Sequence, residues 1–210
     1  MARWLRTDAA APSPDHIGEA ASALRASRVV ILPTDTVYGL HAMAMDPDAV
    51  RSLFRAKRRP EGQPLVVLCG SIEQLQALGV SAAPQIVDAL TRIWPAPLTA
   101  ILPLLSPIPA SAGMNTVGVR IPELSWLREL VERTGPLAST SVNLSGESAV
   151  YSTDHIPKEL LDFVDLVLDA GTIESESSTL VDFTRDEPHV VREGRFRFTQ
   201  KLWKSLWKSL

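Results

Sequence analysis

The sequence predicts an α/β (α+β) protein in which helices pack on a twisted, open, mixed sheet. Two observations point to this class: short β-branched apolar runs have the length of strands, and segments with helical apolar spacing alternate with them over the first two-thirds of the chain. A third observation, the crowding of strand patterns near the end, favours a mixed sheet over a purely parallel one. We expect a single domain over residues 1–210, with a core of about 13–195 and a basic C-terminal tail at 196–210.

Two helices near the N-terminus are predicted from their capping signals. Ser13 followed by Pro14, and later Asp46 followed by Pro47, each place a cap and a first-turn proline before apolar residues at helical spacing. The basic residues of the second helix are expected to point largely outward: Arg51, Arg55, Lys57 and Arg58.

The remaining elements are predicted from shorter patterns. The spacing of Ser71 and Gln74 is typical of a capping box for a short helix. Helical spacing predicts three more helices, at 84–94, 123–134 and 156–163. Apolar runs predict strands at 28–32, 65–69, 98–104, 117–121, 137–141, 164–168, 179–183 and 189–192. Residues 33–40 (Pro-Thr-Asp-Thr-Val-Tyr-Gly-Leu) are expected to form a loop directly after the first of these strands.

Composition and charge exclude several classes of protein. One cysteine forbids an intramolecular disulfide and a cysteine-rich metal site. The uncharged stretch between Arg92 and Arg120 is long enough for a membrane span, but its five prolines exclude a membrane helix. The first residues lack the apolar run of a signal peptide, so a cytoplasmic location is expected. The net charge of −3 argues against general nucleic-acid affinity, although residues 185–210 are basic.

Three polar segments are candidates for binding a ligand, and each has a simpler interpretation. The loop 33–40 offers two threonines and an aspartate to a small polar substrate, or these side chains satisfy their own backbone. Residues 57–60 (Lys-Arg-Arg-Pro) could form an anion site, or a solvated basic end of a helix. Residues 139–146 offer hydroxyls and an amide to a sugar, a base edge or a phosphate, or they form a polar turn.

Smaller signals accompany these segments. Arg120 ends an apolar strand, where a buried charge requires a partner. Ser178 precedes one late strand and Arg192 closes another. The four histidines show no metal-ligand spacing and are expected on the surface, so no metal site is predicted.

Taken in order, the segments resemble the YrdC-like family of threonylcarbamoyl-AMP synthases, which serve tRNA modification. The resemblance extends from about Arg28 to Gly194 and is carried by PTDTVYGL, AKRRP, PLVVL, WPAPLT, VGVRIP, STSVNLSG, SSTLVDF and VVREG. It implies a twisted open α/β sheet around a concave, positively charged surface.

The resemblance also implies a reaction. L-threonine, bicarbonate (or CO2) and ATP would give L-threonylcarbamoyladenylate and pyrophosphate, through a threonine carbamate that attacks the α-phosphorus. Because the carbamate is already anionic, catalysis would consist mostly of positioning and neutralisation of phosphate charge. Mg2+ would accompany the triphosphate. Downstream threonylcarbamoyl-transferase proteins would then act on tRNA, and neither a membrane nor tight sequence-specific nucleic-acid binding is expected.

Matching the motifs residue by residue implies the site. Lys57 and Arg59 would be the catalytic cations. ATP would be held by Lys57, Arg59, Thr116, Ser141, Asn143 and Arg192. Threonine would be held by Thr34, Arg120, Ser139 and Ser178, with Arg120 on its carboxylate. The chain departs from the pattern of many relatives at three positions: His41, Leu68 and Ala96.

Two other functions remain as alternatives. A paralogue could use the same fold for another activity, although such relatives tend to lose the Lys-x-Arg and Ser-x-Asn pairs that this chain retains. An RNA-binding module could use the basic surface near 51–59, but the low net charge and the lack of strands that interleave aromatic and basic residues argue against it.

Overall fold

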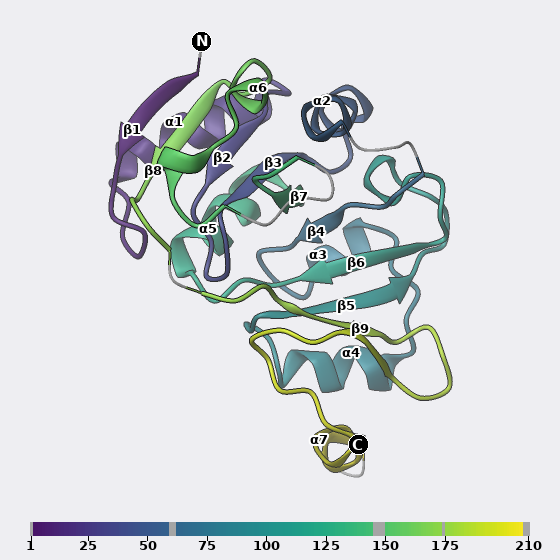
Figure 1. The fold of residues 1–210 in the computed structure, drawn as a ribbon. Helices are drawn as coiled ribbons and strands as arrows, with labels where there is room; N and C mark the ends of the chain where they lie inside the picture. Colours follow the sequence, from purple (N-terminus) through teal and green to yellow (C-terminus); the bar gives the residue numbers. More distant parts are fainter. Residues whose placement is uncertain (1, 59–61, 145–149, 174, 208–210) are drawn as a thin grey trace.

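The computed structural model describes residues 2–58, 62–144, 150–173 and 175–207, whose strands form one open, twisted sheet (Figure 1). Its ten strands follow the order β1-β8-β2-β3-β7-β4-β6-β5-β9-β10. Their bounds are β1 (Arg3–Arg6), β2 (Val30–Leu32), β3 (Gly39–Met43), β4 (Val66–Leu68), β5 (Leu98–Pro103), β6 (Thr116–Arg120), β7 (Leu137–Ser141), β8 (Leu166–Asp169), β9 (Thr179–Asp182) and β10 (His189–Arg192). The sheet contains both parallel and antiparallel pairs of neighbouring strands, which confirms the predicted mixed sheet.

The helices pack on both faces of this sheet. They are α1 (Pro14–Arg25), α2 (Pro47–Lys57), α3 (Gln74–Ala77), α4 (Pro84–Thr91), α5 (Ser125–Thr134), α6 (Lys158–Leu161) and α7 (Gln200–Trp207), with short 3₁₀ turns η1 (Pro109–Ser111) and η2 (Thr153–His155). The two predicted caps are confirmed: Ser13 Oγ accepts from the backbone N–H of His16, and Asp46 accepts from those of Asp48 and Ala49. These bonds satisfy N–H groups that a helix start leaves without partners.

The predicted capping box at Ser71 and Gln74 is wrong. Helix α3 starts at Gln74, with Glu73 in the capping position and no side-chain cap. The Gln74 side chain instead accepts from the backbone N–H of Gly70 (2.8 Å) and donates to the carbonyl of Val131 (3.1 Å). It therefore joins the start of α3 to helix α5, a tertiary contact that local spacing does not reveal.

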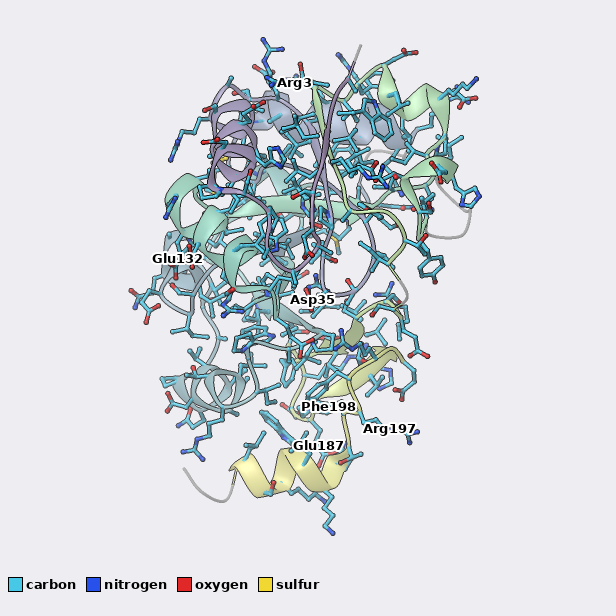
Figure 2. The ribbon with its side chains drawn as sticks, turned by 90° about the vertical axis from the view of Figure 1, so that its left-hand side faces the viewer. Arg3, Asp35, Glu132, Glu187, Arg197 and Phe198 are labelled. Carbon is cyan, nitrogen blue, oxygen red and sulfur yellow. The ribbon has the colours of Figure 1, made fainter. Side chains whose placement is uncertain are left out.

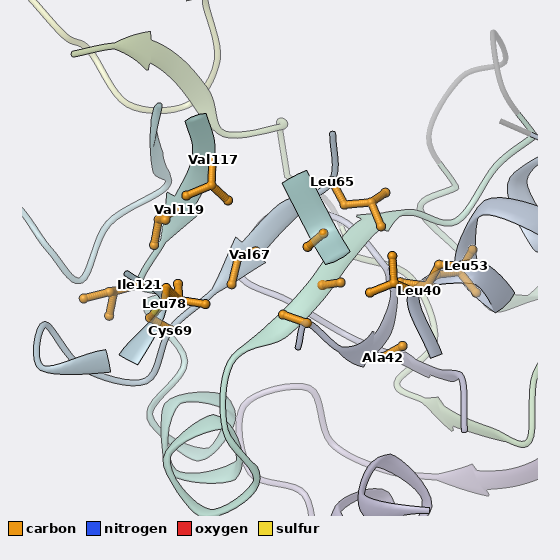
Figure 3. Close-up of a cluster of buried hydrophobic side chains, with 14 of the residues drawn as sticks. Leu40, Ala42, Leu53, Leu65, Val67, Cys69, Leu78, Val117, Val119 and Ile121 are labelled. Carbon is orange, nitrogen blue, oxygen red and sulfur yellow. The ribbon is translucent and has the colours of Figure 1, made fainter. Parts of the chain in front are cut away.

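Side chains on one face of the sheet form the larger core. Val67, Val119 and Ala138 point to this face from neighbouring strands, and Leu53 of α2 and Leu90 of α4 belong to the same buried cluster. Figure 3 shows part of this cluster, including Leu53, Val67 and Val119. Burial of apolar area from water is the main stabilising contribution here.

The other face of the sheet is covered over only part of its width. Helices α1 and α5 bury Leu24 and Leu127 in a second cluster that includes Leu32 of β2, Leu137 of β7 and Leu68 of β4. Beyond Leu68 the same face presents small and polar residues, among them Thr99 of β5. The strands that these two helices leave uncovered form the floor of a cavity.

Strands β1 and β3 lie outside the predicted strands, and helix α7 forms within the predicted C-terminal tail. Strand β1 pairs in parallel with β8 at the edge of the sheet, and β3 pairs with β2 and β7. In the predicted tail, Phe198 and Trp203 are buried, with ring centroids 5.8 and 5.4 Å from that of Phe183. The core therefore includes residues on both sides of the expected 13–195. Within the described residues, no helix is long and apolar enough to cross a membrane.

Candidate active site

A cavity of about 720 Å³ opens over the uncovered half of the sheet. Strands β4, β5, β6, β7 and β9 contribute to its floor, and the 34–38 turn forms one wall. Six of the residues that the sequence assigned to a site line this cavity: Thr34, Arg120, Ser139, Ser141, Ser178 and Arg192. Because strand side chains alternate between faces, Ser139 and Ser141 of β7 reach the same side of the sheet.

The Thr34 turn combines the two interpretations that the sequence left open. The Thr34 hydroxyl accepts from the backbone N–H groups of Thr36 (3.1 Å) and Val37 (3.2 Å) and donates to the carbonyl of Val37 (2.6 Å). It therefore satisfies its own backbone, as polar turn residues commonly do. Thr34 nevertheless lines the cavity, so the bonded turn is itself a wall of the site.

Arg120 has the buried partner that its position at a strand end requires. Its side chain is buried, Nη1 donates to Thr36 Oγ1 at 2.8 Å, and Nη2 lies 3.3 Å from Asp35 Oδ1. Burial lowers the pKa of Arg120 and the Asp35 charge opposes that change, while the guanidinium stays protonated. The Asp35 side chain is also buried, and its Oδ2 has no hydrogen-bond partner among the described residues.

Lys57 does not point outward as predicted. The residue is 4% exposed, and Nζ donates to the carbonyl of Ser141 (2.8 Å) and to Asn143 Oδ1 (2.7 Å). Helix α2 ends at Lys57 because Arg58 adopts a left-handed conformation (φ 47°), and the last turn of the helix meets the end of β7. Arg51, Arg55 and Arg58 are exposed, as expected.

The Lys57 contacts bring together three of the residues assigned to the nucleotide. Ser141 Oγ donates to Asn143 Oδ1 at 2.5 Å, so Asn143 connects the serine and the lysine. Arg59, the second predicted cation, lies outside the described residues. Lys57 and Asn143 are not among the described residues that line the cavity, but both contact Ser141, which does. A lysine held beside hydroxyl and amide groups is suited to binding phosphate oxygens.

Ser178 is held on the opposite side of the cavity floor. Its Oγ lies 2.8 Å from Thr99 Oγ1, and its carbonyl accepts from Arg192 Nη2 at 2.9 Å. Thr116 does not line the cavity within the described part of the chain; it begins β6, four residues before Arg120, and pairs with Pro103.

Asp35 and Thr36 belong to the loop that the sequence offers as a polar binding segment, but the residues matched to threonine did not include them. Thr99, which lines the cavity, was not matched to a ligand either, although it lies in the WPAPLT segment. Tyr151 also lines the cavity and follows no recognised pattern.

His41 and Cys69 are buried groups outside the cavity lining. The prediction of surface histidines is therefore wrong for His41, which lies on a strand in the interior of the sheet with its ring packed over Gly39 of the same strand. Burial and the nearby Arg120 charge lower the pKa of His41 to about 3, so the imidazole is neutral at physiological pH. Burial raises the pKa of the Cys69 thiol to about 12, which leaves it protonated and unreactive.

An open mixed sheet with one face partly uncovered, where hydroxyls and Arg120 line a cavity, is the α/β architecture that the resemblance to the YrdC-like family implies. The structure aligns with the crystal structure of Pyrococcus abyssi Sua5 complexed with L-threonine, with a TM-score of 0.83, 31% identity and coverage of 91% of this chain and 57% of that one. It also aligns with the crystal structure of Escherichia coli YciO, with a TM-score of 0.80, 26% identity and coverage of 92% and 96%.

The chain belongs to the Sua5/YciO/YrdC family, whose model carries the description "Telomere recombination" and matches residues 22–194. It is 35% identical to the threonylcarbamoyl-AMP synthase of Pyrococcus abyssi over 179 residues, and 36% identical to that of Bacillus subtilis over 200 residues. These alignments cover 83% and 91% of this chain but only 53% and 58% of the two relatives. The chain thus spans a little over half the length of these curated relatives.

Proposed function

We propose that this protein is an L-threonylcarbamoyladenylate synthase, which makes threonylcarbamoyl-AMP and pyrophosphate from L-threonine, bicarbonate or CO2, and ATP. The observation that carries the proposal is that two buried cationic side chains lie apart at one cavity: Arg120 lines it, and Lys57 contacts Ser141, which also lines it. Buried Arg120 lies at the Thr34–Thr36 turn, and buried Lys57 lies at the end of β7. An amino-acid carboxylate and a triphosphate would thus bind at different ends of the same cavity. The names and identity of the relatives support this assignment.

Arg120 would bind the carboxylate of threonine. Among the described residues, the Arg120 guanidinium donates to Thr36 and to Asp35. Because a guanidinium has five N–H groups, donors remain for a planar anion. Thr34, Ser139 and Ser178 would surround the rest of the amino acid.

ATP would bind with its phosphates toward Lys57. Ser141 and Asn143 would complete that end, and Arg192, which lines the cavity, would contact the remainder of the nucleotide. The resemblance assigns Arg59 and Thr116 to ATP as well, although Arg59 lies outside the described residues and Thr116 outside the cavity lining. Mg2+ would enter with the triphosphate and keep several waters, since Mg2+ commonly binds substrate phosphates in place of an all-protein cage.

The chain's own contribution to the reaction is positioning and charge. The threonine amine takes up CO2 and loses a proton to give a carbamate, whose oxygen attacks the α-phosphorus as pyrophosphate leaves. Fixing the carboxylate on Arg120 would orient the carbamate toward that phosphorus, and Lys57 would stabilise the negative charge that builds on the phosphates. Neither His41 nor Cys69 is required in these steps.

The product would then be consumed by threonylcarbamoyl-transferase proteins acting on tRNA, and a cytoplasmic location fits that role. The second candidate function is a family member with the same fold and another activity. The departures at His41, Leu68 and Ala96 favour this alternative.

Pyrophosphate release separates the two candidates. With ATP, Mg2+ and bicarbonate, we expect release that depends on L-threonine, together with a product of the mass of threonylcarbamoyl-AMP. Release of the same size without threonine, or no release in the presence of all substrates, would contradict the proposed function.

A further inference from the structure

The segment after β10 is fixed along the edge of the cavity that carries Ser178. The backbone N–H of Arg195 donates to the carbonyl of Ser177 at 3.0 Å. Gly194 lies so close to this edge that a Cβ on it would be 2.3 Å from the Ser177 oxygen and 2.7 Å from the nitrogen of Thr179. Thr179 Oγ1 in turn donates to the carbonyl of Phe196 at 2.6 Å. The backbone of residues 194–196 therefore has a fixed place beside the site.

From this anchored backbone, the Arg195 side chain reaches the opposite wall of the cavity. Nη1 donates to the main-chain carbonyl of Asp35 at 2.6 Å, and Nη2 lies 3.0 Å from Glu123 Oε2. The Asp35 carbonyl also accepts from Ser175 Oγ at 3.2 Å. Arg195 thus joins the turn that contains Thr34 to the segment that carries Ser178.

Asp35 is held from two sides. Arg195 holds its main-chain carbonyl, and the buried Arg120 holds its carboxylate. Figure 2 shows Asp35 above the residues that follow Arg195, with the Arg197 side chain pointing away from it. Because Asp35 and Thr36 contact the guanidinium of Arg120, the place of this turn determines where the remaining donors of Arg120 point.

We propose that Arg195 is a positioning residue for the amino-acid substrate: by holding the Asp35 carbonyl, it keeps the Thr34–Thr36 turn and Arg120 in the arrangement that binds threonine. This inference rests on the proposed function. Arginine suits the task because its planar fork bonds two acceptors at once, here on two different segments. An exposed ion pair such as that with Glu123 contributes little by itself, so the bond to the carbonyl is the important one.

The test compares Arg195→Ala with Arg197→Ala, which removes an exposed arginine two residues away. We expect Arg195→Ala to raise KM and Kd for threonine by about three- to tenfold, the effect of one ordinary hydrogen bond. KM for ATP and the midpoint of unfolding should stay close to those of the unmodified protein. Arg197→Ala should match the unmodified protein in all of these measurements.

Two further variants separate positioning from structure. Arg195→Lys keeps the charge and can reach one acceptor, so it should recover part of the threonine affinity. Glu123→Gln keeps an acceptor beside Arg195 without its charge and should leave threonine affinity nearly unchanged.

Unchanged threonine affinity in a folded Arg195→Ala protein would overturn this role, as would an equal loss of affinity for threonine and ATP. A lack of threonine binding by the unmodified protein would instead overturn the proposed function itself, so the two failures are distinguishable.

Discussion

Replacing Arg120 with methionine should have two separable effects, one on threonine binding and one on stability. Methionine keeps much of the apolar stem and deletes the guanidinium. The contacts of Lys57 with Ser141 and Asn143, where we propose that the nucleotide binds, stay intact. We therefore expect weaker threonine binding with little change in ATP binding.

The size of each effect follows from the contacts of the guanidinium. Loss of a charged hydrogen-bonded pair with the threonine carboxylate costs about 1.5–3 kcal/mol, which weakens binding by about 10- to 150-fold. The same substitution leaves the buried Asp35 carboxylate without its cation. Removing one partner of a buried ion pair typically costs about 3–5 kcal/mol of unfolding free energy.

A second substitution distinguishes the two effects. Arg120→Met combined with Asp35→Asn removes the uncompensated charge, so chemical denaturation should show that much of the lost stability returns. Calorimetry should show that threonine binding does not return, because the donor to its carboxylate is still absent.

The reasoning would be refuted if ATP binding collapsed in the double variant while threonine binding survived, since Arg120 would then belong to the nucleotide. Full recovery of threonine binding on adding Asp35→Asn would also refute it, because Arg120 would then act only as the partner of Asp35.

Three more predictions follow from the buried groups. Lys57→Met should lower turnover by about 10²–10³-fold, as loss of an electrostatic donor commonly does, and should also lower the denaturation midpoint because Lys57 is buried. Arg55→Met, at an exposed position of the same helix, should change neither turnover nor the midpoint. Cys69→Ala should keep most of the activity, and a thiol-blocking reagent should inhibit the unmodified protein poorly, since the thiol with a pKa of about 12 stays protonated; loss of turnover in the folded variant would reveal a nucleophile. The pKa of His41 is about 3 in the folded state, below its ordinary 6.5, so the unfolded chain binds the extra proton, and the free energy of unfolding falls as pH decreases from about 6.5 toward 3, by at most about 1.4 kcal/mol per pH unit from this group. In urea denaturation, His41→Leu should lose less stability over this pH range than the unmodified protein. Equal losses in the two proteins would contradict the low pKa of His41.

The elements with strong local patterns could be predicted from the sequence. Apolar runs predict strands such as β5 and β6, and the capping residues predict the starts of helices α1 and α2. Strand β1 has only four residues at the edge of the sheet, and β3 contains Gly39 and His41 within five. Pairing with neighbouring strands, and not local propensity, makes these two segments strands.

The position of Lys57 shows why helical spacing alone misjudges a site residue. A basic residue in the last turn of a helix is usually solvated and favoured by the helix dipole. Here the end of β7 lies against that turn, and Ser141 and Asn143 provide acceptors for a buried ammonium. The resemblance nevertheless assigned Lys57, Ser141 and Asn143 to the same ligand, ATP, because it rests on matching motifs and does not depend on whether a residue is exposed.

The location of the cavity depends on how far the helices extend across the sheet. Alternation along each strand places Val67 and Val119 in the core and Val66 and Arg120 on the opposite face, which the sequence pattern already indicates. Whether that opposite face becomes core or cavity is decided by α1 and α5, which bury Leu68 and Leu137 but leave Thr99 and Ser178 uncovered. Arg120 lies where these two regions meet, under the Thr34–Thr36 turn. The Arg120 charge is therefore shielded from water and still lines the cavity, the two conditions that the proposed binding of the threonine carboxylate requires.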